Sequence, residues 1–294
     1  MYGIIDIGSN TIRLKIYKLN EEKIESVVDK KEFAKLISYR KDNNLTEAGI
    51  EVCINVLQSF KKIIELLKVD NYYAFATASL RNITNTLEVL SRIKNETGID
   101  VDIISGEDEA LYSYLGATSN INIQNGAMID IGGGSSEIVF FEDDKLLSRY
   151  SIPCGSLNMQ DTFFNEDNLI DFDTKGIKKC VNENLDNQNI QNESLVLIGV
   201  GGTIRALLKL KQKETGLNDK EFSYEDVRRW YQLIKHNPTN WLRFVLKIIP
   251  ERVYTVTSGL VILKTVMKRI GAGKVIVSEY GVREGYLNHI LKSE

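Results

Sequence analysis

Short apolar runs bounded by turn residues recur along the chain, and one arrangement of them occurs twice. A run over residues 4–7 turns through small residues and returns over 12–16, and a run over 128–131 turns likewise and returns over 137–141. Buried strands have this pattern, so each copy predicts a β-hairpin with small residues at its tip. Two matching copies predict a duplicated fold with a phosphate held between its halves.

The two tips have the composition of an anion site. The second reads Gly133-Gly134-Ser135, where glycine lets backbone N–H groups approach an anion without a Cβ in the way, and the first reads Ser9-Asn10. Asp6 and Asp130 end the two strands, and carboxylates beside a phosphate indicate a hard cation, Mg²⁺ or Mn²⁺, between them. Two ordinary hairpins with an aspartate near the turn are the alternative.

Longer segments between the hairpins follow helical spacing. Apolar positions three and four residues apart predict a helix over 46–68, and a second helix over 84–96 stops before Gly98. The segment 161–194 is polar and rich in asparagine, which predicts one weak helix with long loops. Ser223-Tyr224-Glu225-Asp226 has the spacing of a capping box at the start of a further helix.

The duplication predicts an α/β protein of two similar domains with a cleft between them. Residues 1–122 form the first domain in this interpretation, joined by a C-terminal helix over 281–294. Residues 123–280 form the second domain. A chain of 294 residues is long enough for two domains of ordinary size.

Composition narrows the function classes. The net charge of −3 gives no global positive field of the kind that a general nucleic-acid binder uses. Three scattered cysteines and two histidines form neither a zinc-ligand spacing nor a disulfide framework. Asp6 interrupts the first apolar run, which argues against a signal peptide, and no apolar run approaches the ~20 residues that cross a bilayer. We therefore expect a cytoplasmic protein with neither a membrane nor a nucleic-acid partner.

Three acids, Glu107, Asp108 and Glu109, open a predicted helix. Acids at a helix N-terminus stabilise the helix dipole and need no further role. The functional interpretation is that one carboxylate orients or deprotonates an attacking water. Glu109 and Ser113 are four residues apart and share a helix face, whereas Glu107 and Asp108 point elsewhere.

Other candidate residues follow the ends of predicted strands. Glu137 lies amid apolar strand residues, where a carboxylate needs a partner, and is either a second base or metal ligand or an outward-facing residue. Gly201-Gly202-Thr203 lies between a strand and a helix, which suits an anion at a helix N-terminus, although glycine is common in such turns. Arg81 is either a bidentate phosphate ligand or a surface arginine.

Taken together, these segments resemble the exopolyphosphatase/guanosine pentaphosphate phosphohydrolase (Ppx/GppA) family in its short two-domain form. The matching segments are Asp6-Ile-Gly-Ser-Asn10, Ala76-Thr-Ala-Ser-Leu-Arg81, Ile104-Ser-Gly-Glu-Asp-Glu-Ala110, Asp130-Ile-Gly-Gly-Gly-Ser-Ser-Glu137, Gly202-Thr203 and Gly281-Val-Arg-Glu-Gly285. The family belongs to the actin-like ATPase and sugar-kinase superfamily. The resemblance therefore implies two duplicated actin-like ATPase (ribonuclease H-like) domains.

The resemblance also implies a metal-dependent hydrolase that releases terminal phosphate from inorganic polyphosphate or guanosine pentaphosphate. It connects the chain with the stringent response and leaves a homodimer open. By motif, Glu109 corresponds to the general base and Glu137 to a second acid, while Asp6 and Asp130 act through the metal. The phosphate-binding residues that it implies are Ser9, Asn10, Arg81, Gly133, Gly134, Ser135, Gly202 and Thr203.

Three features depart from the family pattern. The chain stops before the helical domain that usually follows, Lys35-Leu36-Ile37-Ser38-Tyr39 stands in place of an Arg-Leu-Gly-Glu-Gly segment, and Asn158 stands in place of an arginine. The loss of basic positions favours a short-chain or nucleotide substrate over long polyphosphate. It also leaves two alternatives: a sensor that binds a phosphate ligand with little turnover, and a sugar or acid kinase-like ATPase of the same superfamily.

Overall fold

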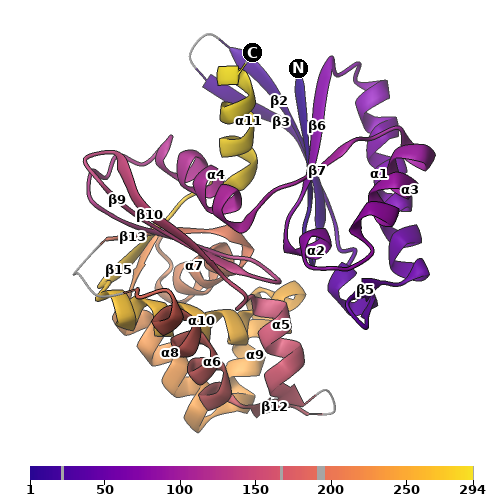
Figure 1. The fold of residues 1–294 in the computed structure, drawn as a ribbon. Coiled ribbons are helices and arrows are strands. Elements are labelled where there is room, and N and C mark those ends of the chain that lie inside the picture. The colour runs from indigo at the N-terminus through magenta and orange to yellow at the C-terminus, as the bar shows by residue number, and fades with distance from the viewer. Residues whose placement is uncertain (21–22, 166–167, 191–195, 294) are drawn as a thin grey trace. The chain divides into compact units, whose positions relative to one another are not determined.

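The computed structural model describes residues 1–20, 23–165, 168–190 and 196–293 (Figure 1). Its contacts divide the chain into two units, Met1–Gly106 and Glu107–Glu294. The predicted domains, which combine 1–122 with 281–294 and set 123–280 apart, divide the chain at other points and stay a prediction, as does the cleft between them.

The first unit contains a five-stranded sheet in the order β3-β2-β1-β6-β7. Its strands are β1 (Tyr2–Ile7), β2 (Ile12–Asn20), β3 (Lys23–Glu32), β6 (Asn71–Ala76) and β7 (Val101–Ile103). The first three strands are antiparallel neighbours, whereas β1, β6 and β7 run parallel. Between β3 and β6 the chain forms η1 (Leu36–Tyr39) and a small strand pair, β4 (Arg40–Lys41) with β5 (Asn44–Leu45).

Two amphipathic helices, α1 (Glu47–Leu66) and α3 (Thr86–Thr97), share one core with this sheet (Figure 1). The predicted helical spacing is confirmed, because Ile50, Leu57 and Phe60 are buried in that core. Thr46 caps α1 by accepting from the N–H of Gly49. Gly98 ends α3 in the left-handed conformation, at φ 69°. The short helix α2 (Ala78–Arg81) follows β6 directly.

The second unit repeats this plan in a six-stranded sheet of order β10-β9-β8-β13-β15-β14. Its strands are β8 (Gly126–Ile131), β9 (Ser136–Glu142), β10 (Lys145–Ile152), β13 (Leu197–Val200), β14 (Glu221–Ser223) and β15 (Lys274–Val277). Apart from the edge strand β14, the order and directions match those of the first unit: three antiparallel strands and then two parallel ones. The structure therefore confirms the duplicated α/β fold of the actin-like, ribonuclease H-like type.

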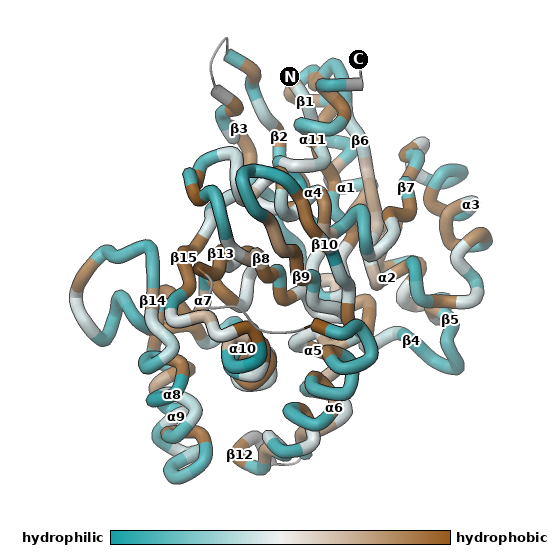
Figure 2. Tube along the Cα trace, turned by 60° about the vertical axis from the view of Figure 1, so that its left-hand side comes forward, coloured by the Kyte–Doolittle hydropathy of each residue, from teal (hydrophilic) through white to brown (hydrophobic). Residues whose placement is uncertain are grey.

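Helices cover both faces of the second sheet. They are α4 (Gly106–Thr118), α5 (Ser156–Phe163), α6 (Thr174–Asn187), α7 (Gly201–Thr215), α8 (Tyr224–His236), α9 (Pro238–Ile248), α10 (Val256–Ile270) and α11 (Val282–Ser293). Along β8 and β9 the side chains alternate: Ala127, Ile129 and Ile138 face a large core with α6 to α10, whereas Met128 and Val139 face α4. Figure 2 shows the hydrophobic colour that follows β8 and β13 between these layers.

The polar segment 161–194 holds more regular structure than its composition predicts. The end of α5 leads into a strand pair, β11 (Phe164–Asn165) with β12 (Asn168–Phe172), and α6 follows. Ile177, Val181 and Leu185 stand four residues apart on α6 and are buried, which explains why a helix forms here. Residues 166–167 and 191–195 of the predicted loops lie outside the described residues.

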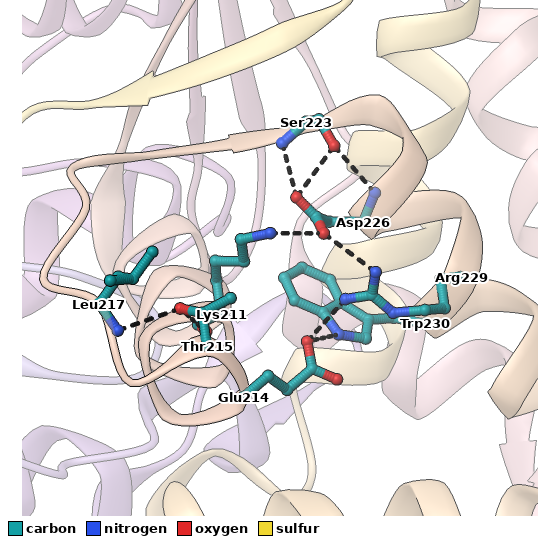
Figure 3. A network of polar contacts seen from close by, with 8 residues as sticks. All are labelled: Lys211, Glu214, Thr215, Leu217, Ser223, Asp226, Arg229 and Trp230. Atoms are coloured by element: carbon teal, nitrogen blue, oxygen red, sulfur yellow. Dashed lines mark hydrogen bonds and ion pairs between the residues drawn. The ribbon is translucent and has the colours of Figure 1, made fainter.

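The predicted capping box at the start of α8 is confirmed (Figure 3). Ser223 Oγ accepts from the N–H of Asp226 at 3.2 Å, and Asp226 Oδ2 accepts from the N–H of Ser223 at 2.9 Å. Asp226 also binds Lys211 of α7 at 2.8 Å and Arg229 at 3.1 Å. Burial raises the pKa of Asp226, but hydrogen bonds from Lys211 and Ser223 lower it below its usual value. This acid therefore joins α7 to α8.

Candidate active site

The second glycine tip is a tight loop whose carbonyl groups bind the start of α5. The N–H of Gly132 donates to the carbonyl of Ser135 at 3.0 Å, which closes the turn between β8 and β9. The carbonyls of Gly132 and Gly133 accept from the first N–H groups of α5 at 2.8–3.2 Å. The C=O and N–H of one peptide point in opposite directions, so the N–H groups of Gly133 and Gly134 point away from α5. Successive N–H groups with this orientation form an anion site.

Gly155 and Asn158 hold α5 against this loop. A Cβ at Gly155 would overlap the backbone of Gly133 and Gly134. Asn158 accepts from the N–H of Gly155 at 2.7 Å and donates to the carbonyls of Gly134 at 3.0 Å and Pro153 at 2.8 Å. The bond to Gly134 turns the N–H of the next residue, Ser135, to the same side as the other two. Asn158, which stands where the family has an arginine, is thus a structural part of the tip.

Three carboxylates lie together in the second unit, beside the tip. Asp130 and Glu137 are direct partners in the β8–β9 register, so their side chains stand on the same face of the sheet. Met128 and Val139 stand on that face too and pack against α4. Glu109, the third acid, comes from α4 and is 9 % exposed.

Glu137 is buried among these acids without a full set of hydrogen bonds. Its exposure is 0 %, and Ser151 Oγ donates to Oε1 at 2.8 Å. Within the described residues, Oε2 has no hydrogen-bond partner. Burial raises the pKa of Glu137 well above its usual value, the charges of Glu109 and Asp130 raise it further, and the hydroxyls of Ser135 and Ser151 oppose this. The environment therefore favours the neutral, protonated form of Glu137.

Asp130 is held by a hydroxyl of α4 and lies against the start of α7. Ser113 Oγ of α4 donates to Oδ2 at 3.1 Å. The other oxygen rests on the backbone of Gly201, the first residue of α7, where a Cβ would overlap it. Gly201 has φ +89°, which also favours glycine, and a helix N-terminus stabilises negative charge. Gly201 is therefore needed to seat the Asp130 carboxylate.

The turn after β13 contains a buried Thr203 and brings in a residue that the sequence did not indicate. Thr203 is 2 % exposed, and its methyl group lies against Gly259 of α10. The guanidinium of Arg252, from η2 (Pro250–Arg252), lies over Gly202, where a Cβ would overlap it. Arg252 belongs to none of the segments that the sequence analysis identified, and only the folded chain brings it to the start of α7.

The two faces of α4 separate its acids as predicted. Glu109 and Ser113 lie on the buried face, while Glu107 and Asp108 pair with Arg149 at 3.3 and 3.8 Å. The side chain of Glu107 is 69 % exposed. Only Glu109 of the three therefore joins the buried acids.

The Gly281–Gly285 segment positions α4 by close packing of α11. A Cβ at Gly285 would overlap the carbonyl of Tyr112, and one at Gly116 would overlap the carbonyl of Gly281. Glu284 is buried and accepts from the N–H of Gly281 at 2.9 Å, which holds the start of α11. This segment acts on the site through the placement of Glu109.

The tip of the first unit repeats the loop geometry. The N–H of Gly8 donates to the carbonyl of Thr11 at 3.0 Å. The carbonyls of Ser9 and Asn10 accept from the N–H groups of Ile37 and Lys35 at 3.1 and 2.9 Å. The Lys35–Tyr39 segment that departs from the family pattern therefore holds the first tip as α5 holds the second.

Asp6 and Arg81 flank this first tip. Asp6 stands opposite Arg13 in the β1–β2 register, and Arg13 pairs with Asp29. Arg81 Nη1 donates to the carbonyl of Ile104 at 3.0 Å, which places Arg81 at the carboxyl ends of β6 and β7. That Asp6, Ser9, Asn10 and Arg81 meet the acids of the second unit stays a prediction.

The donor set of the second unit fits a hydrated divalent cation. Across the described residues, no group of three His, Cys, Asp or Glu side chains is already arranged as metal ligands. Asp130 is nevertheless a hard oxygen donor, and the unbonded Glu137 Oε2 on the same face is a polar atom that a cation or its bound water would satisfy. Mg²⁺ commonly binds one or two carboxylates and completes its shell with water and phosphate oxygens.

Fold and site together define a duplicated actin-like α/β protein with an acid cluster beside a glycine-rich anion loop. The chain belongs to the Ppx/GppA phosphatase family, whose family model matches residues 15–294. The solved Ppx/GppA family member of Aquifex aeolicus superposes with a TM-score of 0.82 at 28% identity, over 100% of this chain and 98% of that one. The family predicted from the sequence is thereby confirmed.

Two relatives of known name match over part of their length. The bifunctional 3-dehydroquinate synthase/phosphatase of Fusobacterium nucleatum is 27% identical over 94% of this chain and 44% of its own. Exopolyphosphatase 1 of Mycobacterium tuberculosis is 28% identical over 52% of this chain and 46% of its own. This chain therefore spans less than half the length of these relatives. No helix of its described residues has the length and apolar character to cross a bilayer.

Proposed function

We propose that this chain hydrolyses a terminal phosphoanhydride bond, in inorganic polyphosphate or guanosine pentaphosphate, by attack of an activated water. The observation that carries the proposal is the cluster of Glu109, Asp130 and Glu137 beside a loop of outward-pointing N–H groups. Membership of a phosphatase family and the names of the two relatives support it. The cellular setting that follows from the proposal is the cytoplasm and the stringent response.

Glu109 is the group best placed to act as the general base. The environment of Glu137 favours its protonated form, which donates a hydrogen bond but does not accept a proton from water. Glu109 belongs to the same cluster and is less deeply buried than Glu137, at 9 % exposure against 0 %, on a helix that close packing holds in place. In this assignment Glu137 is the second acid, which orients the water or a phosphate oxygen.

The anion loop and nearby cations hold the phosphate. The N–H groups of Gly133, Gly134 and Ser135 stabilise charge on the oxygens of the transferred group, and Arg252 supplies a positive charge at the start of α7. Gly202 then contributes backbone only. Thr203 stays a proposed phosphate ligand, and its side chain also packs against α10. Ser9, Asn10 and Arg81 are the proposed first-unit ligands of the same substrate.

A divalent cation, Mg²⁺ or Mn²⁺, would be held by Asp130 from the second unit and by Asp6 from the first. When bound, it supplies the positive charge that neutralises the phosphate and the acids. Ser113 and the backbone of Gly201 orient the Asp130 carboxylate for this role.

The test measures phosphate release from tripolyphosphate, long polyphosphate and guanosine pentaphosphate, with Mg²⁺, with Mn²⁺ and with neither. We expect release that requires a divalent cation and that falls ~10²–10⁴-fold in Glu109→Gln, the usual contribution of a general base. Glu107→Gln is the matched control, because it removes the same charge from the same helical turn on the exposed face. It should keep the wild-type rate.

Other results would favour the two alternatives. Binding of all three compounds without phosphate release would contradict hydrolysis and indicate a sensor. Transfer of phosphate from ATP to a sugar or an acid would indicate a kinase-like enzyme. A homodimer is a further proposal, which sedimentation at several protein concentrations tests.

A further inference from the structure

A second group of cations lies in the second unit, between α6 and α10, which pack against each other (Figure 1). The pocket there has a volume of about 360 Å³, and none of the described residues that line it is acidic. The lining residues are Lys178, Asn182, Lys264, Thr265, Lys268 and Arg269. We refer to it as the α6–α10 pocket.

Two of these lysines converge on one aromatic ring. Lys178 Nζ lies 4.1 Å and Lys264 Nζ 4.6 Å from the centroid of the Tyr231 ring on α8. Cation–π attraction holds both ammonium groups there, but a neutral ring does not cancel their charge. Burial lowers the pKa of Lys264, and the charge of Lys178 lowers it further. The pocket therefore contains lysines that repel one another.

The charged groups around the pocket leave it positive. Asp186 pairs with Arg269 at 2.6 Å and so neutralises that residue. Lys235 on α8 adds a further positive charge, whereas Arg228 on the same helix pairs with Glu225 at 2.9 Å. The Tyr231 hydroxyl lies 3.3 Å from Thr174 Oγ1, and burial raises its pKa, but hydrogen bonding and charge from Lys178 lower it overall.

Helix stability explains only part of this arrangement. Lys268 and Arg269 lie in the last turn of α10, where cations favour the helix dipole. Lys178 and Lys264 lie away from helix C-termini, so the dipole does not account for their placement side by side. An anion in the pocket would offset their repulsion.

We propose that the α6–α10 pocket binds a multiply charged phosphate anion, in polyphosphate or in the phosphate chain of a guanosine nucleotide, at a site separate from the acid cluster. Its volume lies at the lower end of the ~300–1,000 Å³ of ligand pockets, which suits a few phosphate groups. Lysine binds phosphate as a point charge, and Asn182 and Thr265 add neutral polar groups.

The pocket is separated from the anion loop along α10. Ser258, in the first turn of α10, donates to the carbonyl of Ser156 at 2.5 Å, next to the loop. Lys268 follows ten residues later, which is about 15 Å at 1.5 Å per residue. The anion site itself does not depend on the proposed hydrolysis, whereas the choice of phosphate compounds as its ligand rests on the proposed function.

The test measures binding to Glu109→Gln protein, without divalent cations, by titration calorimetry. The ligands are orthophosphate, tripolyphosphate, long polyphosphate and guanosine pentaphosphate, and the last two distinguish the sources of the anion. We expect the Lys178→Gln/Lys264→Gln pair to bind at least one multiply charged ligand tenfold or more weakly. Lys179→Gln, an exposed change of the same charge on α6, should bind normally, and Lys264→Arg should retain binding.

Measuring phosphate release as well as binding distinguishes failure of the pocket from failure of the proposed hydrolase activity. In the otherwise wild-type chain, the lysine pair should hydrolyse tripolyphosphate with an unchanged kcat. Equal loss of binding in Lys179→Gln, or unchanged binding of every ligand by the folded lysine pair, would overturn the pocket and leave the hydrolase untouched. Binding that depends on the lysines in a chain that releases no phosphate would overturn the hydrolase and leave the pocket.

Discussion

The two hairpin tips have the same loop geometry, but the residue opposite the strand-end aspartate is a base in the first and an acid in the second. In the first unit, the residue opposite Asp6 in the β1–β2 register is a base, Arg13, which pairs with Asp29. In the second unit, Asp130 stands opposite Glu137, and Glu109 adds a third acid. A buried acid without full hydrogen bonding is costly and is typical of functional sites. Under the proposed function, this difference favours the second unit for the chemical step and the first for holding the substrate.

The tips also differ in what supports them. The first is held by η1, a four-residue 3-10 turn that follows Lys35 in the left-handed conformation at φ 48°. The second is held by α5, an eight-residue helix with its own capping interaction through Asn158. More backbone and side-chain bonds therefore fix the N–H groups of the second loop, as a catalytic anion site requires.

Among changes that test the two tips, the largest effect is expected when α5 is moved away from the second tip. Gly155→Ala places a methyl group against the backbone of Gly133 and Gly134, so the loop must shift. A displacement of about 1 Å costs roughly 100-fold in rate, and we expect that loss in phosphate release together with a lower melting temperature. Gly273→Ala, where a Cβ meets open space, is the control for stability.

The first tip offers a counterpart to that variant. Lys35→Ala keeps the backbone N–H that donates to Asn10, so the loss of rate should be smaller. Equal losses in Lys35→Ala and Gly155→Ala would contradict the different roles of the two tips.

Glu137→Gln should slow phosphate release less than Glu109→Gln does, because glutamine keeps a neutral hydrogen-bond donor. It should also stabilise the protein at neutral pH. Because the folded-state pKa of Glu137 is raised, the folded protein binds more protons than the unfolded chain, and wild-type stability falls as pH rises above about 4.3. Glu137→Gln lacks this dependence.

Thermal unfolding of wild type and Glu137→Gln between pH 4 and pH 8 tests whether the variant becomes the more stable protein as pH rises. At pH 8, each kcal/mol by which Glu137→Gln raises the free energy of unfolding should raise its melting temperature by about 2–4 °C. This difference from wild type should vanish near pH 4. Glu142→Gln, an exposed position on the same strand, should show no such trend. A destabilised Glu137→Gln protein at pH 8 would mean that the charged form of Glu137 is favoured in the fold.

Asn158→Ala removes three hydrogen bonds at the second tip and should lower the free energy of unfolding by about 1–3 kcal/mol. Asn187→Ala, at the exposed end of α6, is the control in denaturant titration. Asn158→Arg tests the departure from the family directly. If it strengthens binding of long polyphosphate without loss of stability, the structural role of Asn158 is wrong.

The smallest effect on activity is expected from Asp226→Asn, far from either tip in the α7–α8 contact. The folded-state pKa of Asp226 is lowered, so its stabilisation is present above the unfolded pKa of about 3.9 and is lost as pH falls. The free energy of unfolding of the variant should be about 1 kcal/mol lower than that of wild type at pH 7, and little changed at pH 3. Its phosphate release should be normal. Asp219→Asn, an exposed neighbour, should behave as wild type at both pH values.

The sequence predicts those parts of the fold and site that depend on local pattern. Short apolar runs and glycine turns identify both hairpins, and the spacing of Glu109 and Ser113 identifies the buried face of α4. Helix α5 is missed because it is short and starts at Gly155-Ser156, which reads as a turn. The segment around α6 is underestimated because only three apolar positions mark its buried face.

Local sequence patterns do not predict the roles of residues that depend on contacts with distant parts of the chain. Arg252 reaches Gly202 only through the packing of η2 near α7, and Gly201 seats Asp130 only because β13 lies beside β8. Asn158 reads as a lost cation in the sequence, yet its amide completes the second tip. The sequence shows Thr203 as a hydroxyl in a strand–helix turn, but it does not show that the side chain packs against α10.

The most direct test of the central claim is the pH dependence of kcat/KM for tripolyphosphate in wild type and Glu109→Gln. We predict that the wild-type value falls on the acidic side as the general base of the free enzyme gains a proton. Glu109→Gln should show a low rate without that acidic limb. A Glu109→Gln protein that keeps the wild-type rate and the same acidic limb would contradict the assignment of water activation to the acids of the second unit.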